Sequence, residues 1–193
     1  VFNTGYAYQA ENYQRAETPD GPTLGWMKAQ AARLGIHLAG SLLLRDGDAI
    51  YNSALLVAPD GRTWRYDKRY PWGWERAYFR AGQGVTVAET ELGKIGLLIC
   101  WDSAHPNLWR AYAGKVELIL LSSCPPNVSN PTYQMPDGTR LGLAQLGPLF
   151  RRMQADARRA IRESVIRQCA WLGAPGVSTV GCGQFASHLP NGR

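Results

Sequence analysis

Cysteine is scarce in this chain, which has four among its 193 residues. None of them is paired in a CxxC spacing, and they lie far apart at Cys100, Cys124, Cys169 and Cys182. Small disulfide-rich domains and zinc knuckles need denser or paired cysteines. The sequence therefore predicts neither a disulfide framework nor a structural zinc site, and this cysteine usage favours a reducing, cytoplasmic setting.

Long apolar runs are also missing. A membrane-spanning helix needs about 18 or more consecutive apolar residues, and the best candidate here, Ile95–Ile99, ends at Cys100. The first residues, Val1–Tyr6, lack the basic stretch and apolar core of a secretory signal. We therefore expect no membrane segment within this chain.

The charge is basic, with a net charge of +6 and an isoelectric point near 9.3. The dense basic segment is one predicted helix, where acidic residues interrupt the arginines, as on a solvated helix face. We therefore expect no nucleic-acid partner. The residues of this face are Arg151, Arg152, Asp156, Arg158, Arg159, Arg162, Glu163 and Arg167.

The chain is 45% hydrophobic, enough for the core of a single domain over residues 1–193. Residues 36–44 predict a buried strand. Residues 50–58 and 62–67 predict a hairpin, because the intervening Pro59-Asp60-Gly61 matches turn chemistry. A second turn near residues 91–93 leads into Lys94–Ile99, an apolar run typical of a central strand.

Helices alternate with these strands. Thr23 is a predicted cap of a helix to about Arg33, with Gly35 as its stop. Pro106 can open a short helix that ends near Gly114, and residues 116–121 predict the next strand. This strand–helix–strand unit, combined with hairpins, indicates an α/β architecture.

A polar, proline-rich loop is expected from Ser122 to about Gly147, and long loops of this kind are usually functional, so it could cover a pocket. A long helix follows, and its apolar stripe predicts core or subunit interface. The stripe consists of Leu149, Met153, Ala157, Ile161, Val165, Cys169 and Leu172. Both ends look cut, at Gly5-Tyr6 and at Pro190–Arg193, so we expect a partial domain.

Cys100 lies at the carboxyl end of the predicted strand, just before a turn and a helix. Nucleophiles and ligands commonly lie at that edge of a sheet, and the backbone amide of Trp101 could then point at a developing oxyanion. A small buried hydrophobe is the alternative for Cys100. Lys68, at the end of the hairpin, could lower the thiol pKa as a nearby cation or be an ordinary surface lysine.

Several motifs occur in order along the chain: Phe2–Tyr6, Tyr51-Asn52-Ser53, Tyr66–Tyr70, Glu75, Gly93–Gly96, Ile99–Asp102, Gln168–Gly173 and Pro190-Asn191-Gly192. Together they resemble the nitrilase superfamily of carbon–nitrogen hydrolases. The resemblance covers most of the chain and implies an α-β-β-α sandwich, incomplete here, with a Glu-Lys-Cys triad. It also implies no metal or organic cofactor, and homodimers or larger homo-oligomers.

Carried over residue by residue, Cys100 matches the family nucleophile, Lys68 the triad lysine, and Glu75 a second glutamate that positions the lysine and substrate. The resemblance places the first glutamate, the general base, immediately ahead of Val1. The chain as it stands lacks this base, which predicts an inactive fragment of an active parent. Glu75 paired with a neighbouring arginine at the surface is the alternative.

Four further residues are candidate substrate contacts: Trp72, Trp74, Asp102 and His105. Aromatic residues near buried strands are more often core. Asp102 could instead cap a helix or orient the backbone at the turn. A Cys–His dyad through His105 is a further alternative, although an imidazole five residues beyond the nucleophile has no assured reach.

The resemblance implies a hydrolase that cleaves a nonpeptide amide, carbamoyl or nitrile substrate through a cysteine thioester. Two alternatives stay open: a noncatalytic scaffold protein with the same fold, and an acyltransferase of the same superfamily. Residues 125–147 are the predicted determinant of substrate preference.

Overall fold

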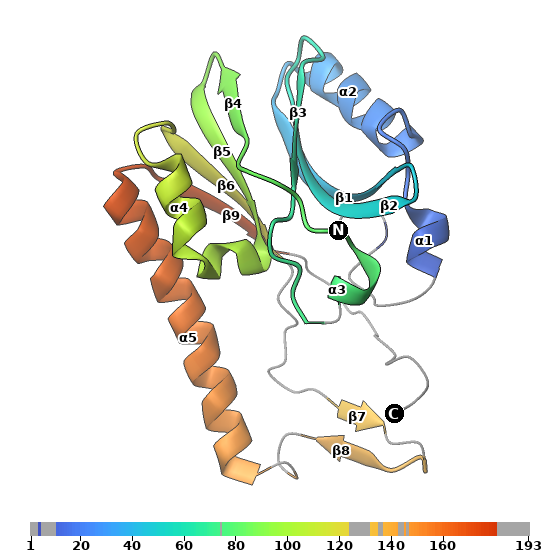
Figure 1. The fold of residues 1–193 in the computed structure, drawn as a ribbon, viewed down its shortest axis with the longest axis vertical. Coiled ribbons are helices and arrows are strands. Elements are labelled where there is room, and N and C mark those ends of the chain that lie inside the picture. Colours follow the sequence, from blue (N-terminus) through green and yellow to red (C-terminus); the bar gives the residue numbers. More distant parts are fainter. Residues whose placement is uncertain are drawn as a thin grey trace.

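The computed structural model describes residues 4, 11–73, 75–123, 132–134, 137–142, 145 and 147–180. Within them, two β-sheets face each other and helices lie on their outer sides (Figure 1). No helix in this described part combines the length and the apolar character needed to cross a bilayer. The sequence expectations for the segments before Glu11 and after Val180 fall outside the described residues, apart from Thr4.

The first sheet is an antiparallel meander in the order β1-β2-β3. Its strands are Leu38–Asp46, Ala49–Val57 and Thr63–Asp67. The predicted turn at residues 59–61 joins β2 to β3, and Gly61 has the positive φ, 88°, that such a turn demands. The hairpin prediction is confirmed, and β1 begins two residues later than expected.

The second sheet has the order β4-β5-β6-β9 and mixes both pairing directions. Its strands are Val87–Thr90, Gly93–Ile99, Leu118–Ser123 and Gly176–Val180. β4 and β5 form the predicted hairpin, whereas β5 and β6 run parallel. Helix α4, Pro106–Tyr112, makes the crossover between them, so the predicted strand–helix–strand unit is confirmed.

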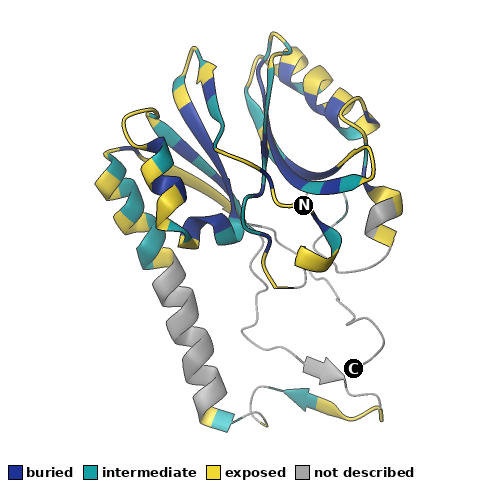
Figure 2. Ribbon diagram, viewed as in Figure 1, coloured by how far each residue is buried: buried dark blue, intermediate teal, exposed yellow. Residues whose placement is uncertain are grey.

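The main core lies between the two sheets and continues beneath α4. Tyr66 and Leu56 of the first sheet share one buried cluster with Leu97 of β5 and with Trp109 and Tyr112 of α4. Figure 2 shows the buried residues along the strands and the exposed ones on the outer surfaces of the helices.

A second cluster joins α2 to the opposite face of the first sheet. The end of α5 packs on the main core through Val165, Cys169 and Leu172, as predicted for this part of the apolar stripe. The side chains of the stripe before residue 162 are outside the described part of the helix. The layers are therefore α2, sheet, sheet, and α4 with α5, which confirms the α-β-β-α sandwich.

Helix α2 extends over Pro22–Leu34 and ends at Gly35, which has the expected left-handed conformation. Its start differs from the prediction, because Gly21 is the N-cap and Thr23 already lies inside the helix. The Glu17 carboxylate replaces the predicted cap and accepts a hydrogen bond from the Thr23 amide at 2.8 Å. A side chain at residue 21 would collide with Glu17, so glycine fits this corner.

The remaining elements are short, apart from α5. They are α1, Glu11–Arg15; α3, Glu75–Tyr78; the 3-10 helix η1, Cys100–Ala104; β7, Thr132–Gln134; β8, Arg140–Gly142; and α5, Gly147–Leu172. The segment predicted as a loop over 122–147 thus contains a small antiparallel hairpin, β7-β8. Its three-residue strands have too little periodicity to be predicted from sequence.

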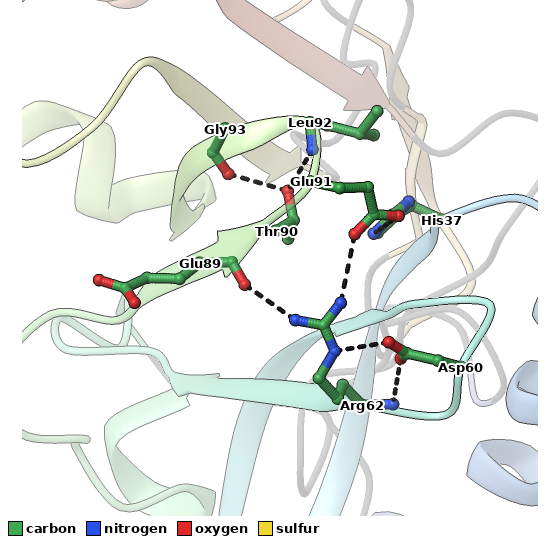
Figure 3. A network of polar contacts seen from close by, with 8 residues as sticks. All are labelled: His37, Asp60, Arg62, Glu89, Thr90, Glu91, Leu92 and Gly93. Atoms are coloured by element: carbon green, nitrogen blue, oxygen red, sulfur yellow. Dashed lines mark hydrogen bonds and ion pairs between the residues drawn. The ribbon is translucent and has the colours of Figure 1, made fainter.

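A polar cluster links the turns of the two sheets (Figure 3). Arg62 donates to Asp60 in its own turn at 2.7 Å, and to the Glu89 carbonyl and Glu91 carboxylate next to the β4-β5 turn at 3.3 and 3.2 Å. His37 Nε2 lies 3.5 Å from the other Glu91 oxygen. The Arg62, Asp60 and Glu91 side chains are about half exposed. Exposed ion pairs of this kind add little stability, so the main effect of the cluster is to hold the two turns next to each other.

Candidate active site

Cys100 follows β5 directly and opens the 3-10 helix η1. Its φ is +46°, and no other non-glycine residue in the described part of the chain has a positive φ. A left-handed conformation is costly for a residue with a Cβ, and such strain concentrates at functional sites. The turn is fastened by the Ser103 hydroxyl, which donates to the Cys100 carbonyl at 2.7 Å. Cys100 is half-buried rather than sealed in the core.

Lys68 lies one residue beyond β3 and is buried, with 1% of its surface exposed. Its ammonium donates to Oε2 of Glu75 at 2.5 Å. Burying an ammonium requires a partner, since the charge loses its hydration. The surface-lysine alternative is therefore wrong, because Lys68 lies in the interior of the protein.

Glu75 begins the short helix α3 and is fully buried. Besides Lys68, its Oε2 accepts a hydrogen bond from the Trp72 amide at 2.6 Å, and its Oε1 accepts one from Asn52 Nδ2 at 3.2 Å. The alternative of a surface carboxylate paired with a neighbouring arginine is therefore wrong. Asn52 on β2, Lys68 just after β3 and the backbone of Trp72 thus converge on this carboxylate.

Asp102 connects the Cys100 turn to the chain on either side of Lys68. Its carboxylate accepts hydrogen bonds from the Tyr66 hydroxyl and the Tyr70 amide, each at 2.8 Å, and from the Ile99 amide at 3.3 Å. These donors lie two residues before Lys68, two residues after it, and immediately before Cys100. Asp102 is fully buried, which favours the backbone-orienting alternative over direct substrate contact.

The electrostatics around Asp102 reflect that burial. Loss of hydration raises the pKa of Asp102 above its ordinary value of 3.8, although its hydrogen bonds from Tyr66 and the backbone of Tyr70 act in the opposite direction. The pKa of Tyr66 is also raised, first by burial and then by the neighbouring Asp102 charge. Tyr66 consequently remains a neutral hydrogen-bond donor at physiological pH.

His105 belongs to an aromatic stack beside the Cys100 turn. Its ring lies 3.6 Å from that of Tyr70, nearly parallel, and meets Trp101 edge-on at 5.9 Å. Burial, and then the charge of Arg76, lowers the pKa of His105 below its ordinary value of 6.5, so the imidazole is neutral at physiological pH. Stacking of the ring on Tyr70 favours a packing role over the dyad alternative.

The other candidate contacts differ in their placement. Trp72 is 42% exposed and lies on the loop that donates to Glu75, so it is accessible to a ligand. Trp101 is half-buried next to Cys100. Trp74 lies outside the described residues.

Gly82 contacts the backbone of Lys68 and was not predicted from the sequence to belong to the site. Its amide donates to the Lys68 carbonyl at 2.9 Å, and its own carbonyl accepts from Arg69 at 2.7 Å. A Cβ at this position would overlap the Asp67 carbonyl oxygen. Only a residue without a side chain can approach this closely.

We expect Gly82→Ala to destabilise the protein by about 1–3 kcal/mol, because the backbone that carries Lys68 must move to accept the methyl group. Urea unfolding of the full-length protein measures the effect. Gly25→Ala is the matched control, since a Cβ there meets no atom within 4 Å and helix α2 should gain stability. Equal midpoints for the two variants would contradict the packing argument.

Tyr66, Tyr70 and Asn52 also contribute side chains or amides to this site without having been predicted to do so. Each belongs to one of the motifs that carry the family resemblance, and membership of such a motif is the sequence feature that could have indicated a role in the site. Their roles depend on partners 23 to 36 residues away. No local pattern encodes such pairings.

Comparison with known proteins identifies the family of this chain. The family model described as carbon-nitrogen hydrolase matches residues 1–160. A nitrilase from Pyrococcus abyssi is 31% identical over 119 residues, which cover 60% of this chain and 45% of that protein. An omega-amidase from Yersinia enterocolitica is 32% identical over 108 residues, which cover 55% and 41%.

Among solved structures, a carbon-nitrogen hydrolase from Helicobacter pylori superposes with a TM-score of 0.68, covering 91% of this chain and 58% of that one. At 21% identity this likeness supports the fold alone. The chain spans less than half the length of the nitrilase and omega-amidase it matches. Because the family model covers most of the chain, this protein belongs to the carbon-nitrogen hydrolase family, within the nitrilase superfamily.

Proposed function

We propose that the full-length protein hydrolyses a nonpeptide carbon–nitrogen bond through a thioester on Cys100. The observation that carries the proposal is the convergence of a strained cysteine turn and a buried Lys68–Glu75 pair, joined through Asp102. A buried ion pair contributes little net stability compared with well-packed apolar residues. Stability alone therefore gives no reason for a lysine at this position, whereas catalysis does.

In the proposed reaction, the Cys100 sulfur attacks the carbonyl carbon of an amide while the thiol proton passes to a carboxylate base. The family resemblance implies that this base is a glutamate. The new C–S bond pushes an electron pair onto the carbonyl oxygen, where the Lys68 ammonium and the Trp101 backbone amide stabilise the negative charge.

Collapse of this intermediate breaks the C–N bond, and the base returns its proton to the departing amine. A water molecule, deprotonated by the same base, then attacks the thioester carbon and releases the acid. The Cys100 sulfur recovers a proton as it leaves. The enzyme is thus restored with no net change in its own atoms.

Lys68 suits this role because its position is fixed before substrate arrives. Glu75 and the surrounding core hold the ammonium in a site with little water, where a charge stabilises an oxyanion more strongly than it would in water. The same cation favours the thiolate form of a nearby cysteine.

The substrate class is a small amide, carbamoyl compound or nitrile. A nitrile would first form a thioimidate. One water would add to it and displace ammonia, leaving the same thioester, which a second water would hydrolyse to the acid. The two relatives named above, a nitrilase and an omega-amidase, support both branches of this class. Transfer of the acyl group to an acceptor other than water is the second candidate outcome.

Intact-mass spectrometry of the full-length protein, incubated with a panel of amides and nitriles, tests the proposal. We expect a mass increase equal to the acyl group, located on the peptide containing Cys100 and absent from Cys100→Ala. Cys169→Ala is the matched control, because this cysteine lies on α5, outside the turn that carries Cys100. A folded full-length protein that never acylates and never turns over would favour the noncatalytic scaffold alternative.

A further inference from the structure

Asn52 occupies a buried position in the middle of the first sheet, with 3% of its surface exposed. It lies on β2, and its backbone carbonyl accepts the Lys68 amide at 2.8 Å. This bond continues the antiparallel register of β2 and β3 by one residue. Cross-strand partners project from the same face of a sheet, so the side chains of Asn52 and Lys68 emerge side by side.

Both side chains bind the same carboxylate, but at different oxygens. Lys68 and the Trp72 amide donate to Oε2 of Glu75, whereas Asn52 Nδ2 donates to Oε1. Among the described residues, Asn52 is the one that donates a hydrogen bond to Oε1 of Glu75. Removing the Asn52 amide would leave Oε1 of the buried Glu75 carboxylate without a hydrogen-bond donor. The carboxylate would then be less firmly held in its orientation.

The orientation of the Asn52 amide follows from this contact. Its Oδ1 is buried and has no hydrogen-bond partner among the described residues. A flipped amide would direct Oδ1 at the Glu75 carboxylate, placing two acceptors against each other. An unsatisfied buried oxygen costs free energy, and fold stability gives no reason to retain it.

We propose that Asn52 is a positioning residue of the active site, which holds the Glu75 carboxylate so that Oε2 clamps the Lys68 ammonium beside the nucleophile. This inference rests on the proposed function. Asn52 acts on the reaction through Glu75 and Lys68, and its contribution is the fixed direction of the lysine charge.

A first experiment measures the rate of Cys100 alkylation by iodoacetamide in the full-length protein across pH, followed on the Cys100 peptide. Asn52→Leu has nearly the same size and no donor. We expect it to alkylate more slowly at neutral pH, with its half-maximal rate displaced to higher pH, because a loosened ammonium stabilises the thiolate less. This readout needs no substrate.

Asn52→Asp gives a separate signature. A protonated aspartic acid can donate to Glu75 as the amide does, whereas an ionised one repels it. The activity of Asn52→Asp relative to wild type should therefore rise as the pH falls, while the ratio for Asn52→Leu should stay flat. With an identified substrate, we expect Asn52→Leu to lower kcat by about 10–100-fold, a range typical for loss of a supporting hydrogen bond, with KM nearly unchanged.

Ser53→Ala is the matched control. Its hydroxyl donates to Asp67 at 2.5 Å from the adjacent position on β2, whose side chain points to the opposite face of the sheet. This variant should lose stability without a change in Cys100 alkylation. Unchanged alkylation in folded Asn52→Leu, or an Asn52→Asp ratio that stays flat with pH, would overturn the inference. A wild type that alkylates normally but never turns over amides or nitriles would instead count against the proposed function alone.

Discussion

Cys100→Gly is expected to abolish turnover in the full-length protein and yet to fold more stably than Cys100→Ala. The residue has a φ of +46°, a conformation that costs a side-chain-bearing residue about 1–2 kcal/mol and glycine little. Allowing for the larger entropy that glycine loses on folding, we expect glycine to exceed alanine by about 1 kcal/mol in free energy of unfolding.

The activity of both variants should fall by about 10⁴-fold or more, as is typical for removal of a nucleophile that acts together with a base. Urea unfolding and single-turnover kinetics on the same preparations measure the two effects. An alanine variant more stable than the glycine variant would contradict the strained turn. Substantial turnover in either would contradict the assignment of Cys100 as the nucleophile.

Lys68→Met is expected to destabilise the protein by about 3–5 kcal/mol, because it leaves the Glu75 carboxylate buried without its cation. Urea midpoints, with an unchanged slope of free energy against denaturant, measure this loss.

The double variant Lys68→Met/Glu75→Gln separates stability from catalysis. It removes both charges together, so we expect it to recover most of the lost free energy of unfolding while remaining inactive. The difference from additivity should then exceed about 2 kcal/mol, as it does for strongly coupled neighbours. Arg62→Gln is a useful comparison, because its half-exposed pairs with Asp60 and Glu91 should contribute less than about 1 kcal/mol each. Additive losses at Lys68 and Glu75 would contradict a coupled buried pair.

Much of the fold could be predicted from local patterns. The turn at residues 59–61, the apolar run of β5, and the stop at Gly35 each depend on a few neighbouring residues, and all three were confirmed. The predictions that failed concern contacts between residues that are further apart in the sequence or strands too short to show a pattern. Glu17, six residues away, accepts the backbone amide of Thr23, which lies inside the helix rather than at its cap, and the expected loop contains the hairpin β7-β8.

The sequence by itself determined the α/β pattern and the strand ends that carry Lys68 and Cys100, and its family motifs implied the sandwich. Tertiary structure alone decided that Lys68 and Glu75 are buried together, that Asp102 joins the cysteine turn to the chain around the lysine, and that Asn52 completes the carboxylate site. The physical reason is distance along the chain. Periodicity and turn chemistry act over a few residues, whereas the burial of a charge depends on which distant strands exclude water from it.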